Sequence, residues 1–449
     1  MNGFIKVIVD ILQQPAILVA LVAILGLVVQ KKPATDIIKG GSKTFIGFLV
    51  LSGGAGLVVS SLEPFSKMFE AAFNVTGVVP NNEAIVAIAL EKYGTLTALV
   101  MFVGMLSNIL IARFTKYKYI YLSGHCIIYF ACMIAVILNA SGFSDTNTIV
   151  LGGIFLGISL VLSPAILQPF MKGIVGHDNI AMAHTGGIGY AISAVIGKFL
   201  GNKSKSTEDI NFPKGLGFLR DSTVSIFMTM MMFYVIVAVC AGASFVEGNI
   251  SSGENFIVYA IKMAGQFAGG IFVILAGVRL ILNEIVPAFK GISEKVVPNA
   301  KPALDCPVVF PFAPNAVLIG FFASFVGGLI SMPIMVALGT TIVLPGVVPH
   351  FFCGATAGVF GNSTGGIRGC VLGSFIHGIF ISFLPIMLMP ILGGLGFVGS
   401  TFSDADYGVF GILLGFLAKY KEMAVISFIA IVLIGMFVTS FNKKEQVGE

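Results

Sequence analysis

The chain has 449 residues, of which 57% are hydrophobic and 10% are charged, and its mean hydropathy is +1.00. These values exclude an ordinary soluble globular domain and indicate a membrane protein. The formal net charge of +5 is concentrated in polar loops, so it reports the orientation of the chain in the membrane rather than binding to nucleic acid.

Uncharged apolar segments of spanning length recur along the chain. They cover residues 11–30, 44–62, 93–112, 119–144, 146–171, 222–246 and 423–442, and a further stretch of 62 residues, 306–367, carries no formal charge. Because a helix needs ~20 apolar residues to cross the hydrocarbon core, the sequence predicts an all-α polytopic membrane protein with about 11 transmembrane helices. The segments are continuous and longer than the alternating strands of a membrane barrel.

The N-terminal sequence MNGFIKVIVDILQQPAILVA has neither a basic region nor a small-residue cleavage site, so we expect the first span to be retained. The six cysteines form no CxxC pair and mostly lie in apolar segments, which predicts neither disulfides nor a zinc site. The chain also lacks Walker A, HExxH and GxSxG sequences. We therefore expect no cofactor and no catalytic residues, and any phosphoryl transfer would need another protein.

Clusters of basic residues mark the loops that we expect on the cytoplasmic side. They are Lys31, Lys32, Lys39 and Lys43 after the first span, Arg113, Lys116 and Lys118 after the third, and Lys198, Lys203, Lys205, Lys214 and Arg220 in the longest polar loop. The segment around Glu247 and Glu254 is acidic, which suits the outer side. This pattern places the N-terminus outside and the tail with Lys443 and Lys444 in the cytoplasm.

Two segments of the chain resemble each other. Residues 46–69 align with residues 269–292 without a gap, at an offset of 223 positions, and six of 24 positions are identical, including Gly54 with Gly277. Lysines cluster before the first segment but after the second, so the two segments enter the membrane from opposite sides. This reversal favours an inverted-topology repeat over a chance resemblance between two glycine-rich helices.

The repeat predicts a division of the chain into four parts. Residues 1–198 form the first five-helix repeat, 199–221 a cytoplasmic connecting loop, 222–422 the second five-helix repeat, and 423–449 the last transmembrane helix with its cytoplasmic tail. The loop charges put both ends of residues 179–197 on the cytoplasmic side, so this segment should dip into the membrane and return. Such re-entrant backbone is tolerated only beside protein or a water-filled cavity.

Several polar side chains are expected at membrane depth, where they are costly and usually face a cavity or a partner. His125 and Tyr129 are four residues apart, hence on one helical face. The offset of 223 carries Asn82 onto Asp305, so these two should face each other across the pseudo-two-fold axis, where inverted-repeat transporters bind substrate. The predicted substrate-binding residues are Asn82, Glu83, His125, Tyr129, His184, Thr185 and Asp305.

Structural interpretations stand beside these functional ones. His350 and His377 are expected to bond backbone carbonyls between helices, and the alternative for Asp305 is an ordinary helix cap in an aqueous vestibule. His177 and His184 are seven residues apart, but no third ligand has suitable spacing, so no metal site is predicted.

Five stretches of the sequence resemble the ascorbate-specific membrane component (IIC) of the bacterial phosphoenolpyruvate-dependent sugar phosphotransferase system. They are KGGSKTFIGFLVLSGGAG, LSGHCIIYFAC, LNEIVPAFKGISEKVVPNAKPALDC, FAPNAV and FCGATAGVFGN. The resemblance implies a homodimer of eleven-helix protomers with inverted repeats in the bacterial inner membrane. It also implies transport of L-ascorbate, with soluble IIA and IIB proteins as partners that relay phosphate, so that ascorbate emerges inside as its 6-phosphate.

The resemblance places the family's substrate contacts on the seven residues named above. His125, His184 and Asp305 match the family, whereas Tyr129 and Thr185 stand where glutamine is expected, and Asn82 and Glu83 replace a neutral pair. A neutral sugar or polyol is therefore the alternative substrate, because a site built for one hydroxyl pattern discriminates against another.

Two other functions stay open at this point. An ion-coupled secondary transporter of a small hydroxylated solute would use Glu83 and Asp305 as proton or sodium sites. A membrane-embedded enzyme would have only His184 and Asp305 to offer, without a nucleophile or a metal site beside them.

Overall fold

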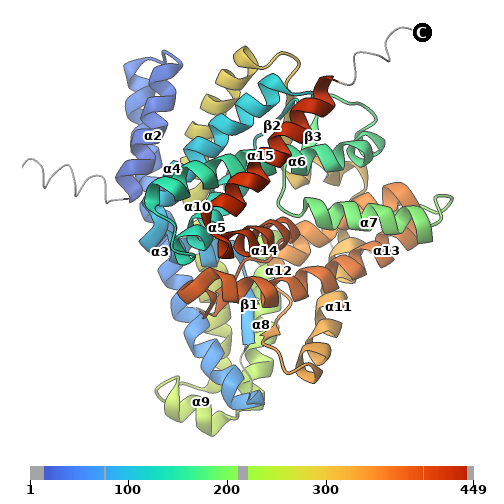
Figure 1. Cartoon of the computed structure of the whole chain (residues 1–449). Coiled ribbons are helices and arrows are strands. Elements are labelled where there is room, and N and C mark those ends of the chain that lie inside the picture. The colour runs from blue at the N-terminus through green and yellow to red at the C-terminus, as the bar shows by residue number, and fades with distance from the viewer. Residues whose placement is uncertain (1–14, 75–76, 211–220, 398, 442–449) are drawn as a thin grey trace, which may run out of the picture.

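The computed structural model describes residues 15–74, 77–210, 221–397 and 399–441, and most of these are helical (Figure 1). The helices of the first half are α2 (Pro15–Val29), α3 (Ala34–Phe73), α4 (Asn82–Phe114), α5 (Gly124–Ala140), α6 (Asp145–Val175) and α7 (Gly187–Leu200). Those of the second half are α8 (Ser222–Ala241), α9 (Ala243–Asn249), α10 (Phe256–Val296), α11 (Pro314–Ala337), α12 (Val347–Pro349), α13 (Ala355–Leu388), α14 (Ala405–Lys419) and α15 (Lys421–Phe441). Shorter helical segments are η1 (Thr207–Asp209), η3 (Cys306–Phe312), η4 (His350–Gly354) and η5 (Met389–Phe397).

Some sequence predictions fall outside the described residues. These are the start of the first predicted span, the middle of the predicted cytoplasmic loop, and the tail with Lys443 and Lys444.

Seven helices in the described part of the chain are long and apolar enough to cross a membrane. An eighth span results if α8 and α9, which meet at 99°, are counted together. Two more apolar helices, α5 and α7, have 17 and 14 residues. The predicted all-α polytopic membrane fold is thus confirmed, while the total of about 11 spans stays a prediction.

The helices form two bundles. In the first, α3 packs along α10, with α2 and α8 beside them. In the second, α4, α5 and α6 pack together, and α13 contacts both α7 and α11. Figure 1 shows α2 and α3 at one edge of the molecule and α7, α11 and α13 at the opposite edge.

Glycines allow α3 and α10 to approach each other at backbone distance. A Cβ atom on Gly54 would lie 2.7 Å from the backbone nitrogen of Ile274, and one on Gly277 would lie 2.5 Å from the backbone nitrogen of Leu51. Any side chain at either position would therefore push the two helices apart. Gly54 and Gly277 are one of the six identical pairs in the sequence alignment, and both belong to this contact.

In the described part of the chain, six short strands form two parallel three-stranded sheets that the sequence analysis did not predict. The strands are β1 (Gly77–Pro80), β2 (Tyr119–Tyr121), β3 (Ala181–Met182), β4 (Lys301–Leu304), β5 (Ile342–Val343) and β6 (Ser400–Thr401). One sheet has the order β5-β1-β6 and the other β2-β4-β3. In each sheet the central strand comes from one half of the chain and both neighbours come from the other half. The strand pairing therefore ties the two halves together.

A sharp break divides α13. Gly366 has φ 58° and ψ −150°, a conformation that strongly favours glycine, and a Cβ there would lie 2.3 Å from the carbonyl oxygen of Lys205. The break turns one apparent long helix into two shorter ones.

Candidate substrate-binding site

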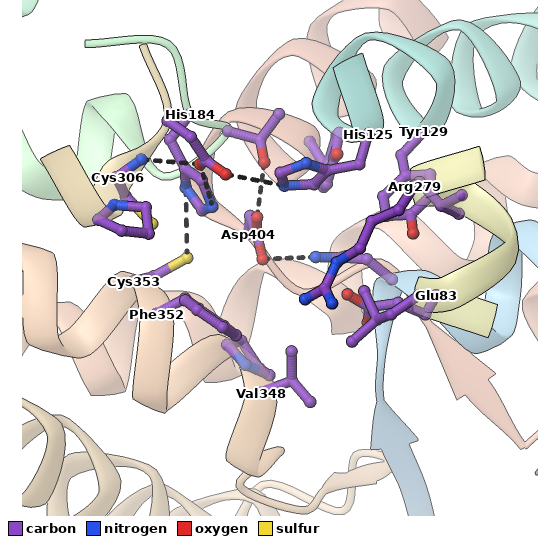
Figure 2. A pocket seen from close by; sticks show the side chains of 18 of the residues that line it. Glu83, His125, Tyr129, His184, Arg279, Cys306, Val348, Phe352, Cys353 and Asp404 are labelled. Atoms are coloured by element: carbon purple, nitrogen blue, oxygen red, sulfur yellow. Dashed lines mark hydrogen bonds and ion pairs between the residues drawn. The ribbon is translucent and has the colours of Figure 1, made fainter. Parts of the chain in front are cut away.

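A cavity of about 310 Å³ lies between the two bundles, and all seven predicted substrate-binding residues line it (Figure 2). The first bundle contributes Leu275, Val278, Arg279 and Asn283, all from α10. The further lining residues are Cys306, Pro307, Val348, Pro349, Phe352, Cys353, Asp404 and Tyr407. The volume suits a small molecule, and the lining mixes apolar walls with a few polar groups, as ligand sites do.

The polar residues reach the cavity because they follow the short strands. Asn82 opens α4 after β1, Asp305 follows β4 directly, His184 and Thr185 follow β3, and Asp404 follows β6. The strands in each sheet are parallel, so their carboxyl ends lie at one edge and bring these residues together. The sheets, although small, position the candidate site.

Two donors fix the protonation of the His184 ring. The backbone N–H of Gly186 donates to Nδ1 of His184 at 3.3 Å, and the Tyr190 hydroxyl lies 2.6 Å from the same nitrogen. A ring nitrogen that accepts from a backbone N–H carries no proton, so the Tyr190 hydroxyl must also donate to it. We therefore assign the ring proton to Nε2, which faces Asp305. In this tautomer His184 offers a hydrogen-bond donor to a ligand.

Asp305 lies between the two histidines of the cavity. Its Oδ2 is 3.8 Å from Nε2 of His125, and its Oδ1 is 3.9 Å from Nε2 of His184. These distances exceed those of hydrogen bonds, so Asp305 and Nε2 of His184 still have bonding capacity for a ligand. Nε2 of His125 also lies 3.4 Å from Cys126 Sγ. Asp305 also caps η3, because its Oδ1 accepts from the backbone N–H of Cys306 at 2.7 Å. Asp305 can therefore cap η3 and bind a ligand at the same time.

Asp404 is a cavity residue that the sequence reasoning missed. It is buried, and its carboxylate accepts from Asn82 Nδ2 and from Thr185 Oγ1, both at 2.6 Å, and from Ser403 Oγ at 3.0 Å. Asp404 thus holds two of the predicted residues in place. A second alignment of the two halves could have found Asp404. At an offset of 219 positions, β3 aligns with β6 and Thr185 aligns with Asp404.

Two buried polar atoms of the cavity lack a hydrogen-bond partner within the described part of the chain. They are Oε2 of Glu83 and the hydroxyl of Tyr129. A buried polar group without a partner costs free energy, and the cost is removed when a ligand supplies the missing bond. When ionised, the Glu83 carboxylate can only accept hydrogen bonds, so a ligand must supply a donor such as a hydroxyl group.

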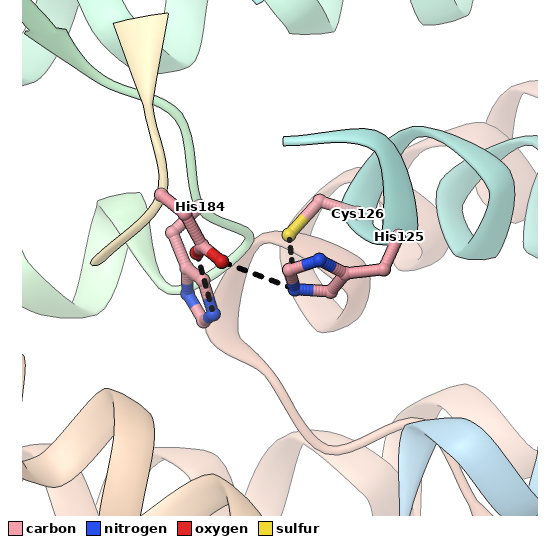
Figure 3. Close-up of side chains that lie close together, drawn as sticks. His125, Cys126 and His184 are labelled. Atoms are coloured by element: carbon pink, nitrogen blue, oxygen red, sulfur yellow. Dashed lines mark hydrogen bonds and ion pairs between the residues drawn. The ribbon is translucent and has the colours of Figure 1, made fainter. Parts of the chain in front are cut away.

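Four potential metal ligands also meet here. Ligand atoms of His125, Cys126, His184 and Asp305 lie within 4.8 Å of one another, and Figure 3 shows both imidazoles and the thiol facing the same space. Imidazole, thiolate and carboxylate are the ligands that zinc takes. However, a metal would have to bind the His184 nitrogen that carries the proton in the assigned tautomer. The geometry therefore fits a hydrogen-bonding organic ligand better than an ion.

The other histidines lie outside this cavity. His350 and His377 are buried and contact the same hydroxyl, Ser324 Oγ, at 2.8 and 3.1 Å, instead of the expected backbone carbonyls. His177 is next to Asp178, which accepts from Lys301 Nζ at 2.8 Å and from Gln168 Nε2 at 2.7 Å. These two bonds hold the pKa of the Asp178 carboxyl below its usual range.

Replacing Tyr190 with phenylalanine should weaken ligand binding about 2- to 10-fold, the equivalent of one lost neutral hydrogen bond. Without the hydroxyl, only Gly186 would hold the His184 tautomer. The ¹⁵N chemical shifts of the His184 ring, measured with binding, should report a mixture of tautomers. Tyr234→Phe is the matched control, because it removes a buried 2.6 Å bond to the carbonyl oxygen of Ser61 in the first bundle. Equal affinities in the two variants would contradict the assignment.

Comparison with known proteins identifies the family of the chain. Residues 10–406 match the family described as the PTS system sugar-specific permease component, EIIC-GAT. The chain is also 25% identical over 433 residues to the "Ascorbate-specific PTS system EIIC component" of Mycoplasma pneumoniae. That match covers 85% of this chain and 65% of the relative, so the chain spans a little less than two thirds of the length of its relative. Because the family match extends over most of the sequence, the chain belongs to the sugar-specific permease (IIC) component family of the phosphotransferase system.

Proposed function

We propose that this chain binds L-ascorbate, or a related sugar or polyol, and moves it across the bacterial inner membrane while a separate IIB protein phosphorylates it. The observation that carries the proposal is one cavity, in a permease-family chain, that gathers the Nε2–H of His184, the carboxylate of Asp305 and the unpartnered Oε2 of Glu83. These groups are complementary to the donors and acceptors of a hydroxylated small molecule. The chain itself would be the translocation subunit and not the phosphorylating enzyme.

We attribute the architecture to two inverted repeats, residues 1–198 and 222–422. In support, the offset of 223 carries the last residue of α3, Phe73, onto the last residue of α10, Val296. It likewise carries the end of α4, Phe114, onto the end of α11, Ala337, and β2 onto β5. Each half of the chain also supplies the central strand of one sheet and the two outer strands of the other sheet. A pseudo-two-fold axis requires this symmetric arrangement.

The same offset relates the walls of the cavity. It carries His125 onto Val348 and Tyr129 onto Phe352, and all four line the cavity. One repeat would thus supply polar groups where the other supplies apolar ones. A two-sided site of this kind suits a sugar ring, which has hydroxyl edges and apolar faces.

Orientation and assembly follow from the loop charges and the family resemblance. The N-terminus would be outside, and the basic connecting loop and the C-terminus would be cytoplasmic, where soluble IIA and IIB proteins act. The functional unit would be a homodimer. The segment between β3 and α7, which carries His184 and Thr185, would form the turn of the re-entrant segment.

Ion-coupled transport is the second candidate, and one observation favours it. Glu83 and Asp404 are buried acids that line the same cavity, and neither forms an ion pair in the described part of the chain. Buried carboxylates of this kind are used as proton or sodium sites in membrane transporters.

Uptake into proteoliposomes should separate the two candidates. We expect the purified protein alone to equilibrate labelled ascorbate slowly and to phosphorylate none. Phosphoenolpyruvate with the cognate soluble phosphotransferase proteins should yield a phosphorylated product in the compartment that holds those proteins. Accumulation of unmodified substrate in response to a proton or sodium gradient would instead support the secondary transporter.

A further inference from the structure

The charged groups of the cavity are unevenly distributed. Its lining contains three carboxylates, those of Glu83, Asp305 and Asp404, but a single guanidinium, that of Arg279. The carboxylates come from the second bundle and its connecting segments, whereas Arg279 stands on α10 in the first bundle. Figure 2 shows the Arg279 side chain reaching from α10 into the cavity, on the side of Glu83.

The face of α10 that carries Arg279 is built into the cavity. Leu275 and Asn283 lie one helical turn to either side of Arg279, and both also line the cavity. The side chain of Arg279 is thus directed into this space by its position on a packed helix, although it keeps access to solvent.

Arg279 forms no ion pair or hydrogen bond with any other described residue. Two of the three acids already have other partners, because Asp404 accepts from Asn82 and Thr185 and Asp305 accepts from the backbone of Cys306. The third, Glu83, has no hydrogen-bond partner for its Oε2 in the described part of the chain and forms no ion pair with Arg279. A guanidinium inside a ligand cavity is therefore left with its donors unused. Its planar fork matches an anionic oxygen, or a pair of adjacent oxygens, better than any other side chain does.

We propose that Arg279 is the specificity-determining residue for an anionic substrate and supplies the counter-charge for a deprotonated oxygen of the ligand. The proposal rests on the proposed function, and it narrows the substrate class to monoanionic hydroxylated rings. L-Ascorbate is such a ring at neutral pH, because its enediol is deprotonated. Arg279 would offset the repulsion from Glu83 that an anion otherwise meets. The bound anion would also connect α10 of the first bundle with His125, His184 and Asp305 of the second.

The test compares two ligands of nearly the same shape. L-Ascorbate is anionic, whereas L-gulono-1,4-lactone has the same five-membered lactone skeleton and side chain, with two ordinary hydroxyls in place of the acidic enediol, and is neutral. Calorimetry would measure the binding of both to the wild type and to Arg279→Gln, Arg279→Lys and Lys262→Gln. Lys262 is the matched control because it is a cation of the same helix that pairs with Glu254, away from the cavity.

We expect Arg279→Gln to lower the affinity for ascorbate about 10- to 100-fold, the effect of losing a charge-assisted hydrogen bond, and to leave the affinity for the lactone unchanged. Arg279→Lys should retain part of the affinity, because the charge stays but the fork is lost. Lys262→Gln should match the wild type for both ligands.

Four results would overturn the proposal. Unchanged ascorbate affinity in Arg279→Gln would remove the role of Arg279 and leave the permease function standing. An equal loss for both ligands would indicate a structural role. If the wild-type protein binds neutral sugars but no anion, the assignment of an anionic substrate is wrong and the permease function stands. If the wild-type protein binds neither, and takes up no sugar with the phosphotransferase proteins, the proposed function is wrong as well.

Discussion

Replacing Asp305 with asparagine, or His184 with alanine, is expected to lower substrate affinity about 10- to 100-fold, a cost of about 1–3 kcal/mol for each change. In the structure these groups face each other at 3.9 Å, too far apart to satisfy one another and near enough for one ligand to contact both. Asparagine keeps the shape of Asp305 but replaces one acceptor oxygen with a donor. Isothermal titration calorimetry on folded, detergent-solubilised protein would measure the change.

His177→Ala is the control for this pair. His177 belongs to the same stretch of sequence as His184 but lies outside the cavity, and its Nδ1 accepts from the backbone N–H of Asn179, at 3.4 Å. Its removal should leave affinity unchanged. A larger loss in His177→Ala than in the other two variants, or no loss in those two, would show that the cavity is not where substrate binds.

Replacing Gly277 with valine is expected to have the largest effect on stability. The first added atom alone would lie 2.5 Å from backbone atoms of α3, namely the carbonyl oxygen of Gly47 and the nitrogen of Leu51, which cannot rotate away. Overpacking typically lowers the free energy of unfolding by about 1–3 kcal/mol, and we expect a clash with backbone atoms to cost at least the upper value. The thermal midpoint, followed by size-exclusion chromatography after heating, should fall sharply.

Gly269→Val, on the same helix, provides the comparison. Apart from its chain neighbours and the backbone of its own helix, no atom of the described residues lies within 4 Å of the position that a Cβ would take at Gly269, so this variant should be close to the wild type. Equal thermal midpoints for the two variants would mean that α3 and α10 do not pack at backbone distance.

The sequence predicted the membrane class and most long helices because a spanning helix leaves a strong signal: about 20 uninterrupted apolar residues. It did not predict the two sheets, because strands such as Ala181–Met182 contain two to four residues and have no periodicity to detect. The break at Gly366 was also missed. A glycine in an apolar run has many roles, and only the close contact with Lys205 shows why this one interrupts a helix.

The candidate site was more predictable than the fold around it. Polar residues in apolar segments are costly, so they stand out, and all seven that the sequence singled out line one cavity. Asp404 was overlooked because the chain around it, SDAD, reads as an ordinary polar loop. Arg279 was overlooked because a lone arginine in a long helix is commonly a loop-proximal or headgroup-facing residue. Only the packing of α10 against the second bundle turns Arg279 toward the cavity.

The exchange of strands between the halves has a consequence for biosynthesis. Strands β1, β2 and β3 emerge from the ribosome early, yet the partners they have in the described structure, β5, β6 and β4, are made only after residue 300. Loop closure over such long separations is slow, and unpaired strand edges are prone to wrong associations. The early helices can insert into the bilayer one by one, but the turns carrying Asn82 and His184 have no sheet to anchor them until most of the chain has been translated. The cavity is therefore among the last features to mature, and the nascent protein passes through a stage in which it is inserted but cannot bind.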